Sequence, residues 1–147
     1  MHKVTLKDIE AAQETLGQIL APTPMIKNDM LSQLYGCEVY LKLETLQPTG
    51  SFKIRGASYR ISRLNEDERK RGVIAASAGN HAQGVAWGAR HFHTSSLIVM
   101  PETAALMKVT NTKNLGATVH LEGNNYDESY QAAQRIMQET GRTYVHA

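Results

Sequence analysis

The sequence has little of several features that define particular classes of protein. Cys37 is its only cysteine, which excludes an internal disulfide and a cluster of thiolate metal ligands. The net charge of +2 is too small to indicate nucleic-acid binding. No apolar run approaches the ~18 residues that span a bilayer, and residues 1–10 lack the apolar core of a signal peptide. We therefore expect a cytoplasmic protein without a membrane or nucleic-acid partner, in which Cys37 packs as a small apolar side chain.

The length and composition are those of one ordinary globular domain. Hydrophobic residues make up 41% and charged residues 20% of the 147 positions, which allows one core but not two full domains. The densest charge run, Glu66–Arg71, mixes both signs and indicates a solvated helix end rather than a phosphate-binding patch.

Helix and strand patterns alternate along the chain. Apolar spacing predicts a helix over residues 5–20, with Thr5 as its N-cap and Asp8 in its first turn, and alternation predicts a strand over 38–43. Helices are predicted over 51–64, from the segment after 76 to about 90, over 103–115 and over 127–139. They alternate with predicted strands over 73–76, 96–100, 117–121 and 143–145. This order predicts an α/β fold, a doubly wound parallel sheet with helices on both faces and right-handed crossovers. Ligands of such sheets bind at the carboxyl ends of the strands.

A lysine lies at the predicted start of a helix, in the segment TGSFKIRGA over residues 49–57. Ser51 is predicted to cap this helix, which puts Lys53 in the first turn, where the helix dipole disfavours an ammonium group. A lysine attacks a carbonyl carbon as the neutral amine, and Phe52 would add an apolar wall beside it. Taken alone, the segment is more typical of a solvent-exposed lysine near a helix start, and it indicates a reactive lysine only in combination with a second motif.

The segment SAGNHAQG, residues 77–84, joins a predicted strand to the next helix. Unpaired N–H groups at such a helix start form an anion site, and Gly79 lets a ligand approach the backbone closely. Ser77 adds a hydroxyl donor, and the amide of Asn80 suits a hydrogen bond to a phenolic oxygen. Gly84 permits tight packing of the helix. A well-capped helix without a ligand is the alternative, and neither G-x-G-x-x-G nor G-x-x-x-x-G-K-[ST] occurs in the chain.

Two alternate histidines, His91 and His93, have no carboxylate or cysteine near them in sequence. At a helix C-terminus their charge suits the dipole, so we expect no metal site there. The sequence also has no H-E-x-x-H, nucleophile-elbow serine or cysteine–histidine motif.

The lysine and asparagine segments, in this order and separated by a βα-sized stretch, resemble the threonine dehydratase (threonine ammonia-lyase) family of fold-type II pyridoxal-phosphate enzymes. The similarity runs along nearly the whole chain and includes LETLQP over 43–48, MPETA over 100–104, and LGA over 115–117 with Val119. The resemblance implies that residues 1–48, with the N-terminal helix and first strand, belong to a large domain. Residues 49–147 would form the small pyridoxal-phosphate domain of βα units.

The resemblance also implies a cofactor, a reaction and roles for particular residues. Pyridoxal 5'-phosphate would be the cofactor, and L-threonine would be converted to 2-oxobutanoate and ammonia, as in isoleucine biosynthesis. Lys53 would bind the aldehyde of the cofactor and later move protons at the substrate α-carbon. Asn80 would bond to the 3-hydroxyl of the cofactor ring, with Phe52 packed near the ring. The residues around the substrate carboxylate would be Ser77, Gly79, Asn80 and His81.

Two positions depart from the family pattern. In the related serine racemases, a second serine follows the first in the asparagine loop and works as an acid/base. Ala78 stands there in this chain and cannot carry a proton, which favours a dehydratase over a racemase. Ala105 replaces an expected proline at a helix start, where it bears on stability rather than chemistry.

The family's glycine-rich phosphate loop and the residue that faces the pyridine nitrogen have no counterpart in these 147 residues. We therefore expect a fragment of a longer enzyme or a truncated gene product, inactive or very weak alone, from an enzyme that forms homo-oligomers at full length. The alternatives are an L-serine dehydratase, a β-replacement enzyme such as a cysteine synthase, and a non-catalytic remnant.

Overall fold

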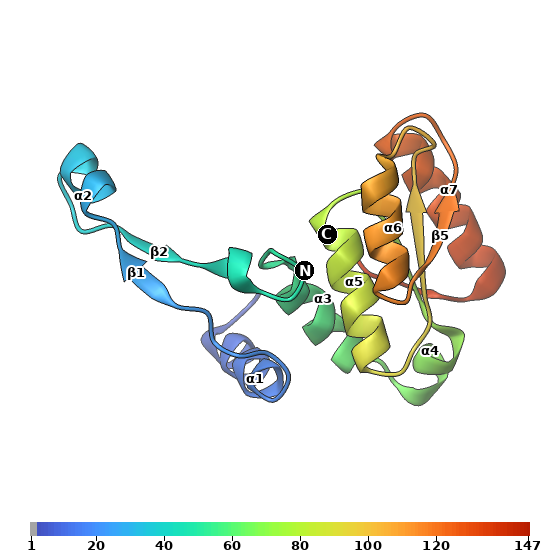
Figure 1. Ribbon diagram of the computed structural model, residues 1–147. Coiled ribbons are helices and arrows are strands. Elements are labelled where there is room, and N and C mark those ends of the chain that lie inside the picture. Colours follow the sequence, from blue (N-terminus) through green and yellow to red (C-terminus); the bar gives the residue numbers. More distant parts are fainter. Residues whose placement is uncertain (1–2) are drawn as a thin grey trace. The chain divides into compact units, whose positions relative to one another are not determined.

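The computed structural model describes residues 3–147, and the chain divides into two compact units (Figure 1). The first unit ends at Phe52 and the second runs from Lys53 to Ala147. No helix within residues 3–147 is both long enough and apolar enough to cross a membrane.

The first unit consists of short elements. In chain order they are the helix α1 (Leu6–Gly17), strand β1 (Met25–Lys27), helix α2 (Asp29–Tyr35), strand β2 (Tyr40–Lys42) and the 3₁₀ helix η1 (Glu44–Leu46). The strands β1 and β2 pair antiparallel, with Ile26 opposite Leu41. The predicted helix and strand are confirmed, but both are shorter than expected, and α2 was not predicted.

Side-chain caps fix where these helices begin. The Thr5 hydroxyl accepts the Asp8 N–H while the Asp8 carboxylate accepts the Thr5 N–H, which confirms the predicted N-cap of α1. Asn28 caps α2 through the N–H of Leu31, at 2.9 Å. Each bond satisfies a donor that the first turn of a helix leaves unpaired.

Cys37 is exposed, so the prediction that it packs as a buried apolar side chain is wrong. It follows Gly36, which ends α2 with a φ of 65°, in the connection to β2. The only buried apolar side chains described in this unit are Leu16 and Leu20, so no core is available to take up the thiol.

The second unit is a four-stranded parallel sheet in the order β5-β4-β3-β6, with helices before and between its strands. The predicted α/β fold is confirmed, and β3 and β4 have the predicted bounds. The elements are α3 (Lys53–Ser62), α4 (Glu66–Arg71), β3 (Val73–Ala76), α5 (Asn80–His91), β4 (Ser96–Met100), α6 (Leu106–Asn114), β5 (Thr118–Leu121), α7 (Tyr126–Thr140) and β6 (Thr143–Tyr144).

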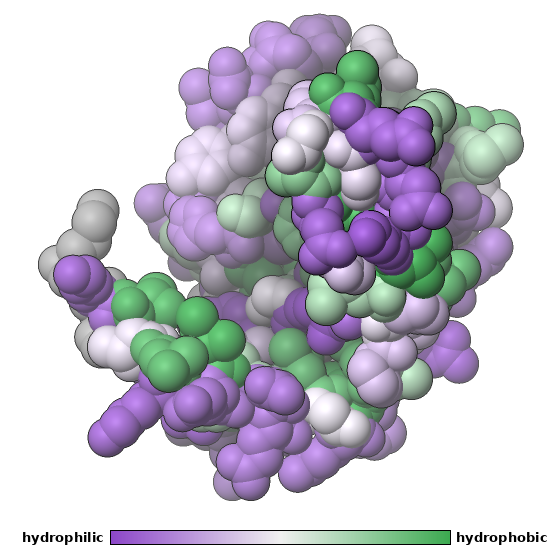
Figure 2. All heavy atoms as spheres, turned by 90° about the vertical axis from the view of Figure 1, so that its left-hand side faces the viewer, coloured by the Kyte–Doolittle hydropathy of each residue, from purple (hydrophilic) through white to green (hydrophobic). Residues whose placement is uncertain are grey.

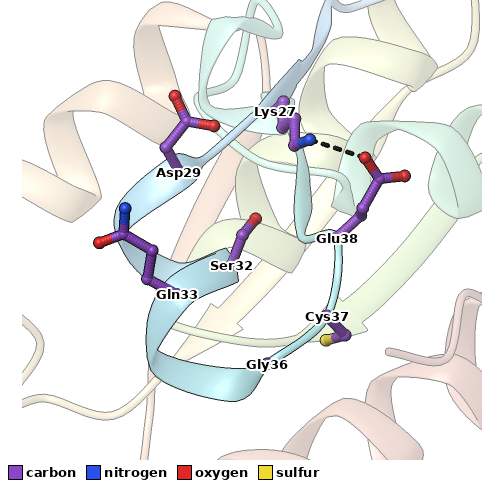
Figure 3. Close-up of a pocket in the computed structure, with 7 residues that line it drawn as sticks. All are labelled: Lys27, Asp29, Ser32, Gln33, Gly36, Cys37 and Glu38. Atoms are coloured by element: carbon purple, nitrogen blue, oxygen red, sulfur yellow. Dashed lines mark hydrogen bonds and ion pairs between the residues drawn. The ribbon is translucent and has the colours of Figure 1, made fainter.

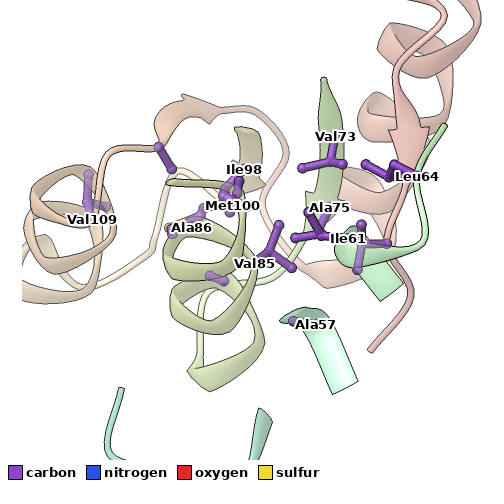
Figure 4. Packing of buried hydrophobic residues seen from close by; sticks show 14 residues of the cluster. Ala57, Ile61, Leu64, Val73, Ala75, Val85, Ala86, Ile98, Met100 and Val109 are labelled. Atoms are coloured by element: carbon purple, nitrogen blue, oxygen red, sulfur yellow. The ribbon is translucent and has the colours of Figure 1, made fainter. Parts of the chain in front are cut away.

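Buried side chains lie on both faces of this sheet, because successive strand residues point in opposite directions. On one face, Val73, Ala75, Ile98 and Met100 pack with residues of α3, α5 and α6 (Figure 4). On the other face, Ile74, Ala76 and Val99 pack with Ala132 and Ala133 of α7. Helices therefore cover both faces, as predicted.

Large apolar side chains also reach the surface, visible in green among the polar ones in Figure 2. Most of those described belong to the first unit, including Leu6 and Ile9 of α1 and Met30 and Leu34 of α2. In the second unit, Leu106 and Met107 at the start of α6 are exposed in the same way.

Candidate functional site

The helices α3 and α5 pack against each other through two glycines of α5. A β-carbon on Gly84 would lie 3.0 Å from the backbone C and O of Lys53, and one on Gly88 would lie 3.0 Å from the Ser58 hydroxyl oxygen. Real side chains rarely approach that closely, so the glycines let the backbones touch. The predicted packing role of Gly84 is confirmed, and its consequence is that the first residue of α3, Lys53, lies against α5.

Lys53 is half-buried, and its charge lies near enough to His81 to act on the imidazole. The predicted cap by Ser51 is wrong, because its hydroxyl oxygen is buried without a hydrogen-bond partner among residues 3–147. Since α3 begins at Lys53, the cap position falls on Phe52, one residue after Ser51. The side chain of Phe52 is 61% exposed.

The loop after β3 is organised by Ser77. Its N–H donates to the carbonyl of Val99 at 3.1 Å, which continues the pairing of β3 with β4. Its hydroxyl oxygen accepts the N–H groups of Gly79 at 3.2 Å and of Ala82 at 3.3 Å. Ser77 therefore caps the start of α5, and its hydroxyl hydrogen remains for a further acceptor.

The start of α5 has the character of an anion site. The N–H groups of Asn80 and His81, the first two residues of the helix, have no acceptor within the described part of the chain. Such groups carry the positive end of the helix dipole and attract a carboxylate or phosphate oxygen. The side chain of Asn80 is exposed beside them.

Gly79 leaves space at this helix start. Its φ of −134° is one that any residue adopts, and apart from its two chain neighbours no atom of residues 3–147 lies within 4 Å of where its β-carbon would be. Neither backbone conformation nor packing within the chain requires a glycine there. A ligand approaching the backbone would require one, which fits a bound carboxylate at this position.

The imidazole of His81 is bonded to another part of the chain. It is buried, and its Nε2 lies 2.9 Å from the carbonyl oxygen of Val145. Because a carbonyl oxygen only accepts, Nε2 carries the hydrogen. Burial lowers the pKa of His81, and the charges of Lys53 and His146 lower it further, against the opposing effect of the Val145 carbonyl. The ring is therefore uncharged near neutral pH, and only the backbone N–H of His81 is available to a ligand.

Two contacts to this loop were not predicted from the sequence. The carbonyl of Val145 is one, and the other is the phenolic oxygen of Tyr144, which accepts the N–H of Ala76 at 3.2 Å. A strand was predicted over 143–145, but nothing in that pattern indicates which loop its residues contact.

Other parts of the chain offer less. A shallow hollow is lined by Lys27 of β1, by residues of α2 and by the connection from Gly36 to Glu38, and it contains the ion pair of Lys27 and Glu38 at 2.6 Å (Figure 3). Both of these side chains are exposed, so the pair contributes little. His91 and His93 lie at the end of α5, as predicted, and the His91 ring stacks on Trp87. Among the residues that the structure describes, no three histidine, cysteine, aspartate or glutamate side chains form a group that would hold a metal.

Comparisons with known proteins identify the family to which the chain is similar. A family model described as pyridoxal-phosphate dependent enzyme matches residues 16–147. The L-threonine ammonia-lyase of Thermotoga maritima is 56% identical over 97% of this chain, which spans only 36% of that protein. The structure of threonine deaminase isoform 2 from Solanum lycopersicum superposes with a TM-score of 0.87 at 32% identity, over 97% of this chain and 41% of that one. Serine racemase from Dictyostelium discoideum gives 0.89 at 33% identity, over 97% of this chain and 47% of that one.

Proposed function

The chain belongs to the pyridoxal-phosphate dependent enzyme family, and we propose that it is part of an L-threonine ammonia-lyase, which converts threonine to 2-oxobutanoate and ammonia. The observation that carries the proposal is the contact at Gly84, since it brings the lysine of α3 to the anion-attracting start of α5. The identity to the Thermotoga maritima enzyme supports threonine as the substrate. The chain covers about a third of that enzyme, so the activity belongs to a protein of greater length.

The residues present fit the cofactor. Lys53 supplies the amine that binds its aldehyde, and Asn80, exposed at the start of α5, supplies an amide for the ring hydroxyl. We assign Phe52, which is exposed next to the lysine, to the apolar surroundings of the ring. Pyridoxal phosphate, when bound, supplies an electron sink for the charge left at the substrate α-carbon.

The chain's own residues then bind the substrate and move its proton. The N–H groups of Asn80 and His81 and the hydroxyl of Ser77 hold the carboxylate over the space beside Gly79. The amine of Lys53 takes the α-proton and returns a proton to the β-hydroxyl, which leaves as water. Hydrolysis of the released enamine by a second water gives 2-oxobutanoate and ammonia. The imidazole of His81 is not assigned to proton transfer, because it is buried and its Nε2–H donates to Val145.

Covalent trapping tests this function in the protein of full natural length. After loading with pyridoxal phosphate and reduction with borohydride, peptide mass mapping is expected to find the cofactor on Lys53. Lys53→Ala is expected to lower 2-oxobutanoate formation from threonine by at least about a thousandfold. Lys108→Ala, on the exposed side of α6, is the matched control and is expected to retain activity. Label on other lysines alone, with Lys53 unmodified, would overturn the assignment.

Serine racemase is a second candidate because its structure superposes closely on this chain. The residue after Ser77 is Ala78, which carries no titratable group, so the loop offers no acid or base there. We therefore expect no D-serine from L-serine, and pyruvate as a minor product beside 2-oxobutanoate. Formation of D-serine at a rate similar to that of 2-oxobutanoate would favour the racemase.

The cellular setting is also part of the proposal. We assign the enzyme to the cytoplasm, as a homo-oligomer that supplies 2-oxobutanoate for isoleucine synthesis, with residues 49–147 as the small pyridoxal-phosphate domain. The expected result of deleting the gene is a requirement for isoleucine that added 2-oxobutanoate relieves. Growth without isoleucine would instead favour a degradative role, as the name of the catabolic Staphylococcus aureus dehydratase indicates for that relative.

A further inference from the structure

On the edge of β3 that faces β6, the last backbone N–H donates to a side chain instead of to a strand partner. Along this edge, the N–H groups of Thr143 and Val145 donate to backbone carbonyls at 3.0 and 2.9 Å. The next N–H on this edge belongs to Ala76, and β6 has ended before it could provide a partner. The phenolic oxygen of Tyr144 accepts this N–H at 3.2 Å. A side chain thus replaces the missing strand partner at the residue directly before Ser77.

The residue after Tyr144 holds the other end of the same loop. The carbonyl oxygen of Val145 accepts the Nε2–H of His81, the second residue of α5. Val145 is only 1% exposed and His81 6%, so water has little access to replace this bond. Two adjacent residues therefore bind both ends of the loop that carries Gly79 and Asn80.

We propose that Tyr144 and Val145 form a clamp that positions the Ser77–His81 loop, which makes Tyr144 and His81 positioning residues for the substrate carboxylate. The inference rests on the proposed function, since it assigns a task to contacts around that site. Backbone N–H groups favour a bound oxygen most when their directions are fixed before the ligand arrives. The clamp fixes them from the two residues that bracket the loop.

The ring of Tyr144 is held independently of its hydroxyl. It packs edge-on against Tyr130, with centroids 5.7 Å apart, and lies against His146 at 4.6 Å. Burial raises the pKa of Tyr144, so the phenol stays protonated at neutral pH. Tyr144→Phe therefore removes one hydrogen-bond acceptor and leaves the aromatic packing in place.

The first test measures binding without elimination. The probe is L-2-aminobutanoate, which has the carboxylate and amine of threonine but no β-hydroxyl to lose, titrated while the amide NMR signals of Gly79 and Asn80 are followed. We expect Tyr144→Phe to weaken its binding about tenfold and to speed hydrogen exchange at the Ala76 amide. In the loaded enzyme, we expect KM for threonine to rise about tenfold while kcat changes less than about twofold.

Matched variants distinguish an effect on the position of the Ser77–His81 loop from a general loss of protein stability. Tyr130→Phe removes a hydroxyl from the same aromatic cluster and is expected to change neither binding nor KM. His81→Phe keeps a ring without the donor and is expected to act like Tyr144→Phe. His81→Gln can donate from a similar place and is expected to restore most of the affinity. Because both bonds hold one loop, the double variant Tyr144→Phe/His81→Phe is expected to weaken binding by less than the product of the single effects.

The outcomes separate this inference from the proposed function. Unchanged affinity, KM and Ala76 exchange in Tyr144→Phe would overturn the clamp, while Lys53 labelling and 2-oxobutanoate formation would leave the function intact. A fall in kcat with KM unchanged would also overturn it, because the clamp acts on carboxylate binding. If Lys53 is unlabelled but the amides still respond to 2-aminobutanoate and to Tyr144→Phe, the clamp stands and the function fails.

Discussion

In the unit that ends at Phe52, the only apolar side chains described as buried are Leu16 and Leu20, whereas each strand of the central pair in the second unit is buried on both faces. The first unit is held by hydrogen bonds, with two capped helices and one pair of three-residue strands. The second is held by apolar side chains buried on both faces of its sheet. Local hydrogen bonds determine where an element begins, but burial of apolar area supplies most of the free energy of folding. The candidate carboxylate-binding loop, Ser77–His81, belongs to the second unit, which has the larger core.

The largest expected effect on the free energy of unfolding comes from truncating a buried isoleucine. Truncating one isoleucine in each unit therefore tests the difference in burial. Ile98→Ala removes a fully buried side chain from β4 and is expected to lower the free energy of unfolding by about 2–5 kcal/mol. Ile9→Ala, on the exposed side of α1, is expected to change it by less than about 0.5 kcal/mol. Urea unfolding followed by circular dichroism measures both. Equal losses would show that the two units do not differ in this way.

A pair of glycines sharpens the comparison. A β-carbon on Gly84 would meet backbone atoms of Lys53 at 3.0 Å, so Gly84→Ala is expected to cost about 1–3 kcal/mol and to weaken cofactor labelling of Lys53. A β-carbon on Gly17, in the last turn of α1, would meet no atom of residues 3–147 within 4 Å outside its own stretch of helix. Gly17→Ala is therefore expected to be neutral or stabilising by up to about 1 kcal/mol. A stable Gly84→Ala protein with normal labelling would contradict the assigned role of the helix contact.

The second unit is also expected to be the acid-sensitive one. Folding lowers the pKa of His81 below its ordinary value of 6.5, mainly through burial, so the unfolded chain binds a proton more readily. The stabilisation is complete above pH 6.5 and is lost as the pH falls below that value towards the lower pKa of the folded state. In the protein without substitutions, the urea midpoint of unfolding is expected to decrease as the pH is lowered from 7.5 to 5.

His81→Gln is expected to flatten this pH dependence between pH 6.5 and 5. His91→Gln, an exposed position at the end of α5, is the control and is expected to keep the native slope. A slope that survives in His81→Gln would assign the acid sensitivity to another group.

The elements of the second unit were predicted from the sequence more completely than those of the first. The strands β3 and β4 were predicted with their bounds, because four consecutive apolar residues between turns specify a buried strand. The helix α2 was missed, since it has seven residues and none of them is buried, which leaves no apolar periodicity to find. The helix α6 begins three residues later than predicted, because Ala104 N–H closes a turn on the carbonyl of Pro101 first.

The candidate site was predicted in part. The loop after β3 and its capped helix follow from residues adjacent in sequence, and the structure has them there. The contacts of Tyr144 and His81 join residues separated by 68 and 64 positions, so no local pattern indicates them. Ser51 was predicted as a cap from its residue type, although a shift of one residue in the helix start removes that role.

The smallest expected effect compares one serine from each unit. The hydroxyl of Ser32 donates to the Asn28 carbonyl at 2.7 Å and accepts the Val39 N–H at 2.9 Å, so Ser32→Ala is expected to cost about 1–2 kcal/mol. The hydroxyl of Ser58, fully buried between α3 and α5, has no hydrogen-bond partner among residues 3–147. Removing it relieves the cost of burying an unpaired polar group, so Ser58→Ala is expected to stabilise by up to about 1 kcal/mol. A loss for Ser58→Ala equal to that of Ser32→Ala would mean that the Ser58 hydroxyl finds a partner in solution, and the packing of α3 on α5 would need another account.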